Sequence, residues 1–393
     1  MYDVVIVGAG VHGAGVALAA TAAGYRTLLL EKWHPAHGTS SRSSKLIHGG
    51  LRYLESAQFR LVRESLTERA LMLRNAPELV RLQPFFLPVY GNTRRRPWQL
   101  RVGLSMYALL GGLKPGTGFG SIPRSQWANL DDMELDGLQA VIRYWDGQTD
   151  DAALTRAIVQ AAQQLGCEVS VPATFTAAEL GQDGVVVQFT QSGRAQSARA
   201  RVLVNAAGPW ATDVLKQIQP AQPLRSVELV QGTHIVLPGA TTRGIYYVEA
   251  PQDGRAVFVM PWRNHTLVGT TETSYQGPPE DVRPLPSEVS YLLEIAQHYF
   301  PKFRSLSTHD VMASFAGLRV LPRANTKAFN RPRETMLEVD RKMKPRVLTI
   351  YGGKLTAWRA TGEQVVKRLH SSLPGRARRA DTEDVRLLPA NGV

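Results

Sequence analysis

The chain has 393 residues, which is enough for one large domain or two interleaved domains with a substantial core. Hydrophobic residues make up 44% and charged residues 20%, a composition that excludes disordered and fibrous proteins. The single cysteine, Cys167, excludes an internal disulfide framework and fits a reducing compartment, where we expect it to be a buried structural residue.

The net charge of +13 is concentrated in two regions. Residues 320–393 contain 16 Lys and Arg against 7 Asp and Glu, and residues 60–101 contain 9 against 3. Such surfaces attract nucleic acid, anionic membranes or anionic small molecules. The sequence has no basic repeat interleaved with aromatic residues and no known nucleic-acid motif, so we expect no nucleic-acid partner. A flavoprotein with a nucleic-acid or scaffold role stays open as a minor alternative.

The run between Asp3 and Arg26 has no charged residue and is long enough for a membrane span. Its glycines cluster towards the start, and no basic segment precedes it. We therefore expect neither a signal peptide nor a spanning helix, and any membrane contact should be peripheral.

The segment from Met1 to Glu31 predicts a complete βαβ unit. Residues 3–7 (DVVIV) read as a buried strand, the G-x-G-x-x-G of Gly8, Gly10 and Gly13 follows, and a small-residue helix over 14–23 leads to a second strand at 27–30. These glycines allow a tight turn, close approach to a pyrophosphate and close helix–strand packing. Glu31, at the end of the second strand, is placed for the adenosine ribose hydroxyls and argues against NADP. His12 receives no role, and the unit alone does not separate FAD from NAD.

A long polar loop, Gly38 to Glu55 (GTSSRSSKLIHGGLRYLE), follows this unit. It carries a hydroxyl cluster, several cations and the pair Gly49-Gly50, all of which can hold an anion. Long ordered loops in compact domains are usually functional, although a solvated surface loop is the alternative.

The middle of the chain alternates helical and strand patterns. We expect a helix over 56–73, a strand over 83–90, an apolar helix over 97–113, a helix from Asp150 or Asp151 to Leu165, a hairpin of 184–190 with 198–204, and an antiparallel sheet over 227–271. The segment 97–113 follows three arginines; we favour a core helix, with a basic and apolar membrane foot as the alternative.

The C-terminal part should contain a helix over 286–300, strands over 312–321 and 347–350, a helix over 356–369 and a loose charged tail over 376–393. Glycine turns between a strand and a helix occur at Gly8, Gly208 and Gly352. Three such turns from distant parts of the chain indicate one extended ligand, which FAD fits better than NAD.

Six segments are similar to the FAD-dependent glycerol-3-phosphate dehydrogenases, relatives of the D-amino-acid-oxidase-like flavoproteins. They are TSSRSSKLIHGGLRYLE at 39–55, NAAGPW at 205–210, GTHIVLP at 232–238, VGTTE at 268–272, GLR at 317–319 and GGKLT at 352–356. The resemblance covers nearly the whole chain. It departs from the family in Glu272, where aspartate is usual, and in length, because the family usually continues into a helical C-terminal domain; we therefore expect a short form.

The resemblance implies an α/β fold in which an FAD-binding Rossmann-like domain of the glutathione-reductase type is interleaved with a mainly antiparallel substrate domain. We expect the FAD domain to comprise 1–92, 150–215 and 345–372, the substrate or cap domain 93–149 and 216–344, and the tail 373–393. The motif and the resemblance together predict non-covalent FAD contacts from Gly8, Gly10, Gly13, Glu31, Thr39, Ser40, Ser41, Ser44, Lys45, Leu46, His48, Gly49, Gly50, Ala207, Gly208, Trp210, Gly317, Gly353, Lys354, Leu355 and Thr356.

The resemblance also implies the chemistry. His234, Lys354 and Arg319 are expected to be catalytic, and Arg52, Tyr53, Thr271, Arg319 and Arg333 to bind substrate; no metal is expected. His234 would take the hydroxyl proton of sn-glycerol 3-phosphate while the C2 hydride passes to flavin N5, and the electrons would go on to a quinone or another acceptor. Oxidation of another 2-hydroxy acid or an amino acid is the alternative, since arginines also bind carboxylates. We expect a cytoplasmic protein, with peripheral contact to the inner face of the membrane.

Overall fold

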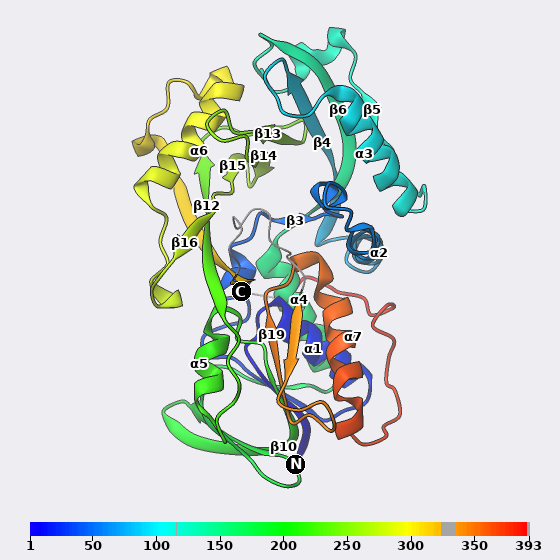
Figure 1. The fold of residues 1–393 in the computed structure, drawn as a ribbon, viewed down its shortest axis with the longest axis vertical. Helices are drawn as coiled ribbons and strands as arrows, with labels where there is room; N and C mark the ends of the chain where they lie inside the picture. Colours follow the sequence, from blue (N-terminus) through cyan, green and yellow to red (C-terminus); the bar gives the residue numbers. More distant parts are fainter. Residues whose placement is uncertain (115, 324–334, 391–393) are drawn as a thin grey trace.

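The computed structural model describes residues 1–114, 116–323 and 335–390, which form two sheets, one in each half of the molecule (Figure 1). Among these residues, no helix is both long and apolar enough to cross a membrane. The lower half in Figure 1 holds both β1, at the N-terminus, and β19, near the C-terminus. The chain therefore returns to its first sheet after building the second.

The lower sheet is a mixed sheet around a parallel centre. Its strands are β1 (Tyr2–Val7), β2 (Thr27–Leu30), β7 (Glu168–Ser170), β8 (Ala173–Leu180), β9 (Val185–Gln191), β10 (Arg194–Asn205), β11 (Ile218–Gln219), β18 (Met336–Val339) and β19 (Val347–Tyr351). The order is β11-β8-β9-β10-β1-β2-β7, with β19 beside the end of β10 and β18 beside β19. Strands β1, β2, β10 and β19 run parallel, so their carboxyl ends meet at one edge, which is where open α/β sheets bind ligands.

The upper sheet is mainly antiparallel. Its strands are β3 (Leu46–Ile47), β4 (Val80–Tyr90), β5 (Gly120–Ser121), β6 (Leu138–Thr149), β12 (Val227–Leu237), β13 (Ile245–Glu249), β14 (Ala256–Trp262), β15 (His265–Gly269), β16 (Thr273–Tyr275) and β17 (Ala313–Pro322). The order is β16-β12-β15-β14-β13-β4-β6-β3, with β17 beside β12 and β5 beside β6. The pair of β13 with β4 is parallel.

Helices cover both sheets. They are α1 (Val11–Ala22), α2 (Phe59–Asn75), α3 (Pro97–Leu110), α4 (Asp151–Gln164), α5 (Ala211–Lys216), α6 (Pro286–Tyr299) and α7 (Trp358–Leu369). Helices α1, α4 and α7 pack together in the lower half, where α1 lies between the other two. The small side chains of α1 permit this close approach, and nearly all of its residues are buried. Helix α6 covers the core of the upper sheet, and α2 and α3 cover its far side, towards β4 and β6.

Most predicted elements are confirmed. The strands at 3–7 and 27–30, the hairpin of β9 with β10, and the helices α6 and α7 lie where they were expected. Helix α1 begins at Val11, earlier than predicted, because Gly10 of the turn is already its N-cap. Strand β6 was missed, since Asp146 and Gly147 interrupt its apolar pattern. Cys167 is buried as expected, and burial raises the pKa of its thiol to about 12.

Strand pairing departs from the predicted domain boundaries in two places. Segment 1–92 was expected to be FAD domain throughout, but β3 and β4 pair within the upper sheet. Segment 216–344 was expected to be cap domain, but β18 pairs with β19 in the lower sheet. Sheet membership follows from pairing: β3 and β4 pair with β6, which lies much further along the chain, whereas β18 pairs with the next strand, β19.

The prediction of a loose tail is wrong for the described part of the tail. Arg376 forms an ion pair with buried Asp3 at 3.0 Å, and Arg379 donates its backbone N–H to the carbonyl oxygen of Ala22 at 2.7 Å. Leu387 is 2% exposed and belongs to the core around α1. A charged sequence is therefore held in place by specific partners on the lower half of the molecule.

Candidate active site

A cavity of about 630 Å³ receives side chains from both sheets. All three predicted glycine turns reach its wall, at Gly8, Gly208 and Gly352-Gly353. Most of the predicted site residues lie in this wall: Gly8, Gly10, Glu31, Thr39, Ser40, Ser44, Leu46, His48, Gly50, Arg52, Tyr53, Ala207, Gly208, Trp210, His234, Gly317, Arg319, Gly353, Lys354, Leu355 and Thr356. Residues from the first, middle and last parts of the chain thus meet at one long cavity.

The G-x-G-x-x-G turn has the close contacts that its pattern predicts. Gly8 adopts a φ of +100°, and a Cβ there would lie 2.8 Å from the carbonyl oxygen of Ala206 at the end of β10. A Cβ at Gly13 would lie 1.8 Å from the carbonyl oxygen of Gly8, so Gly13 serves helix–strand packing and does not line the cavity. This leaves the N-terminus of α1 facing the cavity at Gly10, where a helix favours negative charge.

Glu31 closes this end of the cavity. It is 7% exposed, and its two carboxylate oxygens accept hydrogen bonds from the backbone N–H groups of Ala9 at 2.8 Å and Trp33 at 2.9 Å. Ser40 accepts another backbone hydrogen bond, from Val11 at 2.8 Å. Turn, acidic residue and hydroxyl loop are thus tied together. The glycine cradle, the helix N-terminus and this carboxylate fit the pyrophosphate and ribose of a dinucleotide such as FAD.

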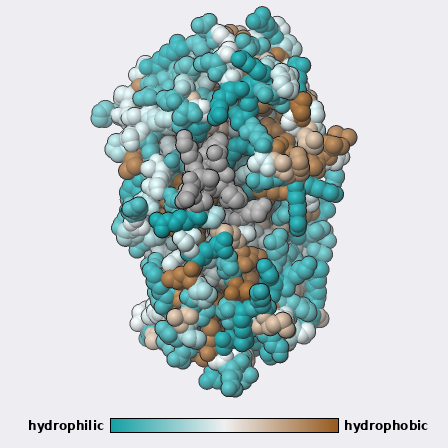
Figure 2. Space-filling model, in the orientation of Figure 1, coloured by the Kyte–Doolittle hydropathy of each residue, from teal (hydrophilic) through white to brown (hydrophobic). Residues whose placement is uncertain are grey.

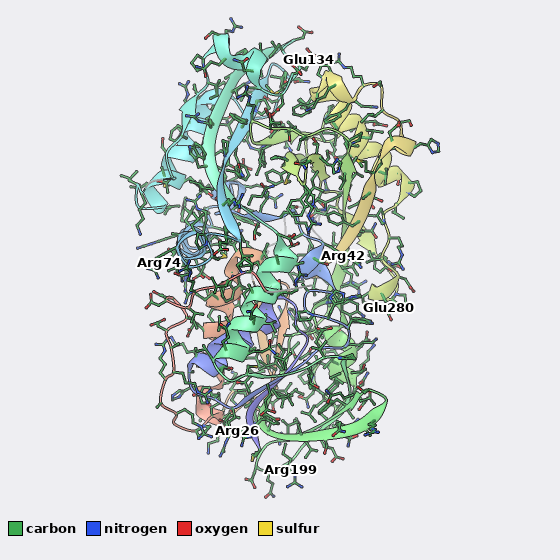
Figure 3. The ribbon with its side chains drawn as sticks, turned by 180° about the vertical axis from the view of Figure 1, so that it is seen from behind. Arg26, Arg42, Arg74, Glu134, Arg199 and Glu280 are labelled. Atoms are coloured by element: carbon green, nitrogen blue, oxygen red, sulfur yellow. The ribbon has the colours of Figure 1, made fainter. Side chains whose placement is uncertain are left out.

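Arg42 and Glu280 also line the cavity, and both lie on the same side of the molecule in the rear view (Figure 3). Glu280 accepts a hydrogen bond from Nε1 of Trp210 at 2.9 Å. The indole of Trp33 lies 5.4 Å from that of Trp210 and stacks on the ring of His37 at 4.4 Å. An aromatic wall therefore flanks the end of the cavity at which Glu31 lies.

The predicted base His234 lies on β12 in the upper sheet. Its side chain is 1% exposed, stacks on Phe315 at 5.0 Å between centroids, and has Nε2 at 2.9 Å from the hydroxyl of Ser44. Burial first, and then the positive charges of Arg319 and Lys45, hold its pKa well below the ordinary 6.5. The imidazole is therefore neutral at pH 7, the form that accepts a proton.

Lys354 reaches the cavity from the turn after β19. Its Nζ lies 3.6 Å from the centroid of the Tyr53 ring, and the guanidinium of Arg52 lies 5.9 Å from the same centroid. Tyr53 and Arg52 belong to the short helix η2 (Leu51–Leu54). A cation over an aromatic face is held in place without losing its charge. Loop 38–55 and the last glycine turn therefore join at Tyr53.

Arg319 lies on β17, and its guanidinium crosses above β12. Its Nη1 is 3.1 Å from Oε1 of Glu272, and its Nη2 donates to Oγ1 of Thr270 at 3.3 Å. A Cβ at Gly232 would lie only 2.6 Å from Nη2, so a glycine is required where the arginine passes. Arg319 is thereby directed to the cavity by neighbours from β12 and from the segment after β15.

Several residues predicted to contact ligand lie elsewhere. Lys45 forms a buried ion pair with Asp151 at 2.6 Å and donates to the carbonyl oxygen of Ser41, and neither Lys45 nor Ser41 lines the cavity. The positive charge of Lys45 compensates a buried carboxylate, which would be very costly without a counter-charge.

Two other residues predicted to contact a ligand, Gly49 and Thr271, also hydrogen-bond to protein groups. Gly49 donates its N–H to the hydroxyl of Tyr107 at 2.8 Å, and Thr271 donates its hydroxyl to buried Glu288 at 2.7 Å. Both lie outside the cavity wall. The predicted substrate residue Arg333 falls outside the described residues.

The structure also adds wall residues that the sequence did not single out. They include Trp33, His37, Tyr247, Arg255, Phe258, Thr270 and Leu318, together with His12 and Glu272, which received no site role. His12 packs on the last glycine turn, since a Cβ at Gly353 would lie 2.2 Å from its Nε2, and burial lowers its pKa to about 4. His12 could have been located from its position inside the G-x-G-x-x-G motif, whereas no motif in the sequence marks Arg255.

The chain is similar to known proteins over nearly its whole length. The family model described as FAD dependent oxidoreductase (DAO) matches residues 3–367. D-erythritol 1-phosphate dehydrogenase of Brucella abortus is 36% identical over 95% of this chain and 74% of that protein, and aerobic glycerol-3-phosphate dehydrogenase of Escherichia coli is 34% identical over 97% and 78%.

A solved structure supports the same grouping. Glycerol-3-phosphate dehydrogenase from Bacillus halodurans complexed with FAD superposes with a TM-score of 0.75 at 27% identity, covering 98% of this chain and 68% of that one. The mixed α/β architecture with an interleaved antiparallel sheet agrees with the predicted fold class.

Proposed function

This chain belongs to the FAD dependent oxidoreductase family and is of the glycerol-3-phosphate dehydrogenase type, and from that premise we propose that it oxidises sn-glycerol 3-phosphate to dihydroxyacetone phosphate. The observation that carries the proposal is a buried, neutral histidine, His234, in one cavity with cationic side chains that include Arg52, Arg319 and Lys354. A neutral base beside cations suits removal of a proton from the hydroxyl group of an anionic substrate.

The residues divide the work by their chemistry. His234 accepts the proton of the C2 hydroxyl, and the positive charge of Lys354 stabilises the negative charge that develops on that oxygen. Arg319 and Arg52 bind the phosphate, because guanidinium forks match phosphate oxygens. Bound FAD would supply the hydride acceptor. The hydroxyls of Thr39 and Ser40 and the glycine turns would hold it non-covalently.

The domain assignment follows strand pairing. We propose that the lower sheet with α1, α4, α5 and α7 binds FAD and that the upper sheet with α2, α3 and α6 carries the substrate pocket. The described tail, residues 373–390, then belongs to the FAD-binding part, on which it packs.

A longer phosphorylated polyol is the second candidate substrate. The relative named D-erythritol 1-phosphate dehydrogenase is as similar to this chain as the glycerol-3-phosphate dehydrogenases are. It supports a phosphorylated polyol over a hydroxy acid or an amino acid. Both phosphates present a dianion and a vicinal hydroxyl group, so the same cavity chemistry serves either.

The electron acceptor is proposed to be a quinone reached at an anionic membrane surface. Helix α3 buries Leu104, Tyr107 and Ala108 and exposes a stripe on its other face. The stripe consists of Trp98 (65% exposed), Val102 (61%), Met106 (38%), Leu109 (60%) and, just beyond the helix, Leu113 (72%). Figure 2 shows a hydrophobic patch on the right side of the molecule, where α3 lies in Figure 1.

Exposed cations border the stripe, namely Arg94, Arg96, Arg101 and Lys114. An apolar face with basic flanks matches the chemistry of an anionic lipid surface. Helix α3 therefore packs on the core with one face and exposes the other. This supports the basic and apolar membrane foot, which was the alternative to a core helix.

The test is anaerobic reduction of the purified holoenzyme, followed through the bleaching of the flavin absorbance. We expect rapid bleaching with sn-glycerol 3-phosphate, and a comparison with D-erythritol 1-phosphate ranks the two polyols. The matched control is His234→Asn, which should retain flavin but bleach slowly. Bleaching by a 2-hydroxy acid or an amino acid, with none by either polyol phosphate, would overturn the proposal.

A further inference from the structure

Three charged residues, Arg255, Glu272 and Arg319, form an ion-paired triad in the cavity wall. The carboxylate of Glu272 lies between two guanidinium groups, with Oε1 at 3.1 Å from Nη1 of Arg319 and Oε2 at 3.3 Å from Nη2 of Arg255. Each carboxylate oxygen therefore faces a different arginine. All three residues line the cavity.

The three side chains of the triad differ in how deeply they are buried. The side chain of Glu272 is 1% exposed, whereas those of Arg255 and Arg319 are 19% and 23% exposed. The carboxylate thus lies behind the arginines, away from solvent, and the arginines are the more accessible members. A buried carboxylate costs desolvation energy that ion pairing does little more than offset, so stability alone is a weak reason for this arrangement.

The sheet brings the three residues together. Arg319 is on β17, Arg255 directly precedes β14, and Glu272 follows β15, which pairs with β14 and with β12. Strand β12 separates β17 from β15, and the guanidinium of Arg319 crosses it above Gly232. Arg319 thus reaches the carboxylate across one strand, β12, whereas Arg255 reaches it from the start of β14, which is adjacent to β15.

The charges favour a dianion. Two guanidinium groups and one carboxylate leave one net positive charge in the triad, and Arg52 and Lys354 add two more in the same cavity. A phosphate dianion has three acceptor oxygens and binds best to more than one fork, whereas one fork satisfies a carboxylate.

We propose that Glu272 is a positioning residue that aligns Arg255 and Arg319 as a two-arginine clamp, and that Arg255 selects phosphorylated over uncharged polyols. This inference rests on the proposed function for the identity of the reaction. Arg255 contacts the phosphate, while Glu272 acts only through the two arginines.

The test uses holoenzyme variants with three readouts: KM for sn-glycerol 3-phosphate, the inhibition constant of inorganic phosphate, and kcat/KM for glycerol. Arg255→Gln is expected to raise KM for sn-glycerol 3-phosphate and the inhibition constant of phosphate about tenfold or more. It should leave kcat/KM for glycerol unchanged, because glycerol has no phosphate. Glu272→Gln should also raise KM and the phosphate inhibition constant, with the limiting rate of flavin reduction retained. Arg255→Lys, which keeps the charge without the fork, should recover part of the phosphate inhibition.

The matched control is Arg263→Gln, which removes one positive charge from the same β14–β15 hairpin but from a side chain that is 72% exposed and pairs with Asp150. It should change none of the three readouts. The flavin content of every variant verifies that the cofactor part is intact, and Arg255→Lys keeps the test valid if Arg255→Gln does not fold.

Three results are decisive. The clamp is overturned if wild-type enzyme oxidises sn-glycerol 3-phosphate and Arg255→Gln leaves KM and the phosphate inhibition constant unchanged. It is also overturned if glycerol turnover falls as much as that of the phosphorylated substrate. Phosphate binding that depends on Arg255, in an enzyme that does not oxidise sn-glycerol 3-phosphate, would support the clamp while overturning the proposed substrate.

Discussion

The hydroxyl of Ser44 lies 2.9 Å from Nε2 of His234, so a residue of the long loop 38–55 contacts a strand residue 190 positions later. His234 also stacks on the ring of Phe315. Ser44 therefore provides the hydrogen-bond partner of Nε2 in the buried imidazole. The contact joins the loop predicted to hold the cofactor to the residue predicted to be the base.

Replacing Ser44 tests this relationship. Ser44→Ala removes the hydrogen-bond partner of the buried Nε2 of His234. Leaving a buried polar atom without its partner costs about 1–3 kcal/mol. We expect flavin reduction to slow by about tenfold or more, with flavin retained, and stopped-flow absorbance measures it. The matched control is Ser41→Ala in the same loop, because Ser41 does not line the cavity and its hydroxyl donates to the backbone carbonyl oxygen of Gly38 at 3.1 Å. Equal rates for both variants would refute a role for Ser44.

The pH dependence of flavin reduction tests the base. Burial and the charges of Arg319 and Lys45 lower the pKa of His234, so the proton-accepting neutral form persists below pH 6.5. We expect the limiting rate at saturating substrate to fall only below pH 6.5, and His234→Asn to lower that rate by about 10²–10⁴-fold at pH 7. An acid limb with an apparent pKa above 6.5, or one that survives in His234→Asn, would assign the base elsewhere.

The contact of Lys354 with Tyr53 predicts a difference between two substitutions of the tyrosine. Tyr53→Leu removes the aromatic face that lies 3.6 Å from Nζ, whereas Tyr53→Phe keeps it. A cation–π contact contributes about 0.5–2 kcal/mol. We expect Tyr53→Leu to slow flavin reduction about tenfold and Tyr53→Phe to stay close to wild type. If Tyr53→Phe is as slow as Tyr53→Leu, the phenol hydroxyl, and not the ring, is what matters.

The buried ion pair of Lys45 with Asp151 predicts an effect on stability. Asp151→Asn leaves an ammonium group buried without its counter-charge, so the free energy of unfolding should fall by about 3–5 kcal/mol. The double variant Lys45→Met/Asp151→Asn removes that charge and should recover much of the loss. Urea denaturation of the holoenzyme measures both. A double variant no more stable than Asp151→Asn would show that the charge itself is not the cause.

The exposed stripe of α3 predicts binding to anionic vesicles. Wild-type protein should sediment with vesicles of phosphatidylglycerol and phosphatidylcholine, less so at high salt, because added salt screens the flanking arginines. Trp98→Asp/Leu109→Asp should reduce this binding strongly without changing flavin reduction. Met343→Asp is the control, since Met343 is 79% exposed but lies away from α3. Equal sedimentation of both variants would mean that α3 does not dock.

Local pattern alone was sufficient for the first βαβ unit and for most other elements. Strand β1 pairs with β2, its neighbour in the sequence, and the alternating strands of 227–271 show their sheet type in their own sequence. Matching segments such as HGGLRYLE and GGKLT then indicated FAD and the family, which the comparisons confirm.

Tertiary structure decided which polar residues face the cavity. Lys45 and Ser44 are neighbours in a loop of uniform composition, yet one compensates a buried carboxylate and the other contacts His234. Sequence spacing cannot separate them, because the partners, Asp151 and His234, arrive from elements far along the chain. Arg255 was invisible for the same reason: its pairing with Glu272 exists only once β14 and β15 are paired. Short-range sterics determine local elements, whereas charge compensation and burial depend on the assembled sheets.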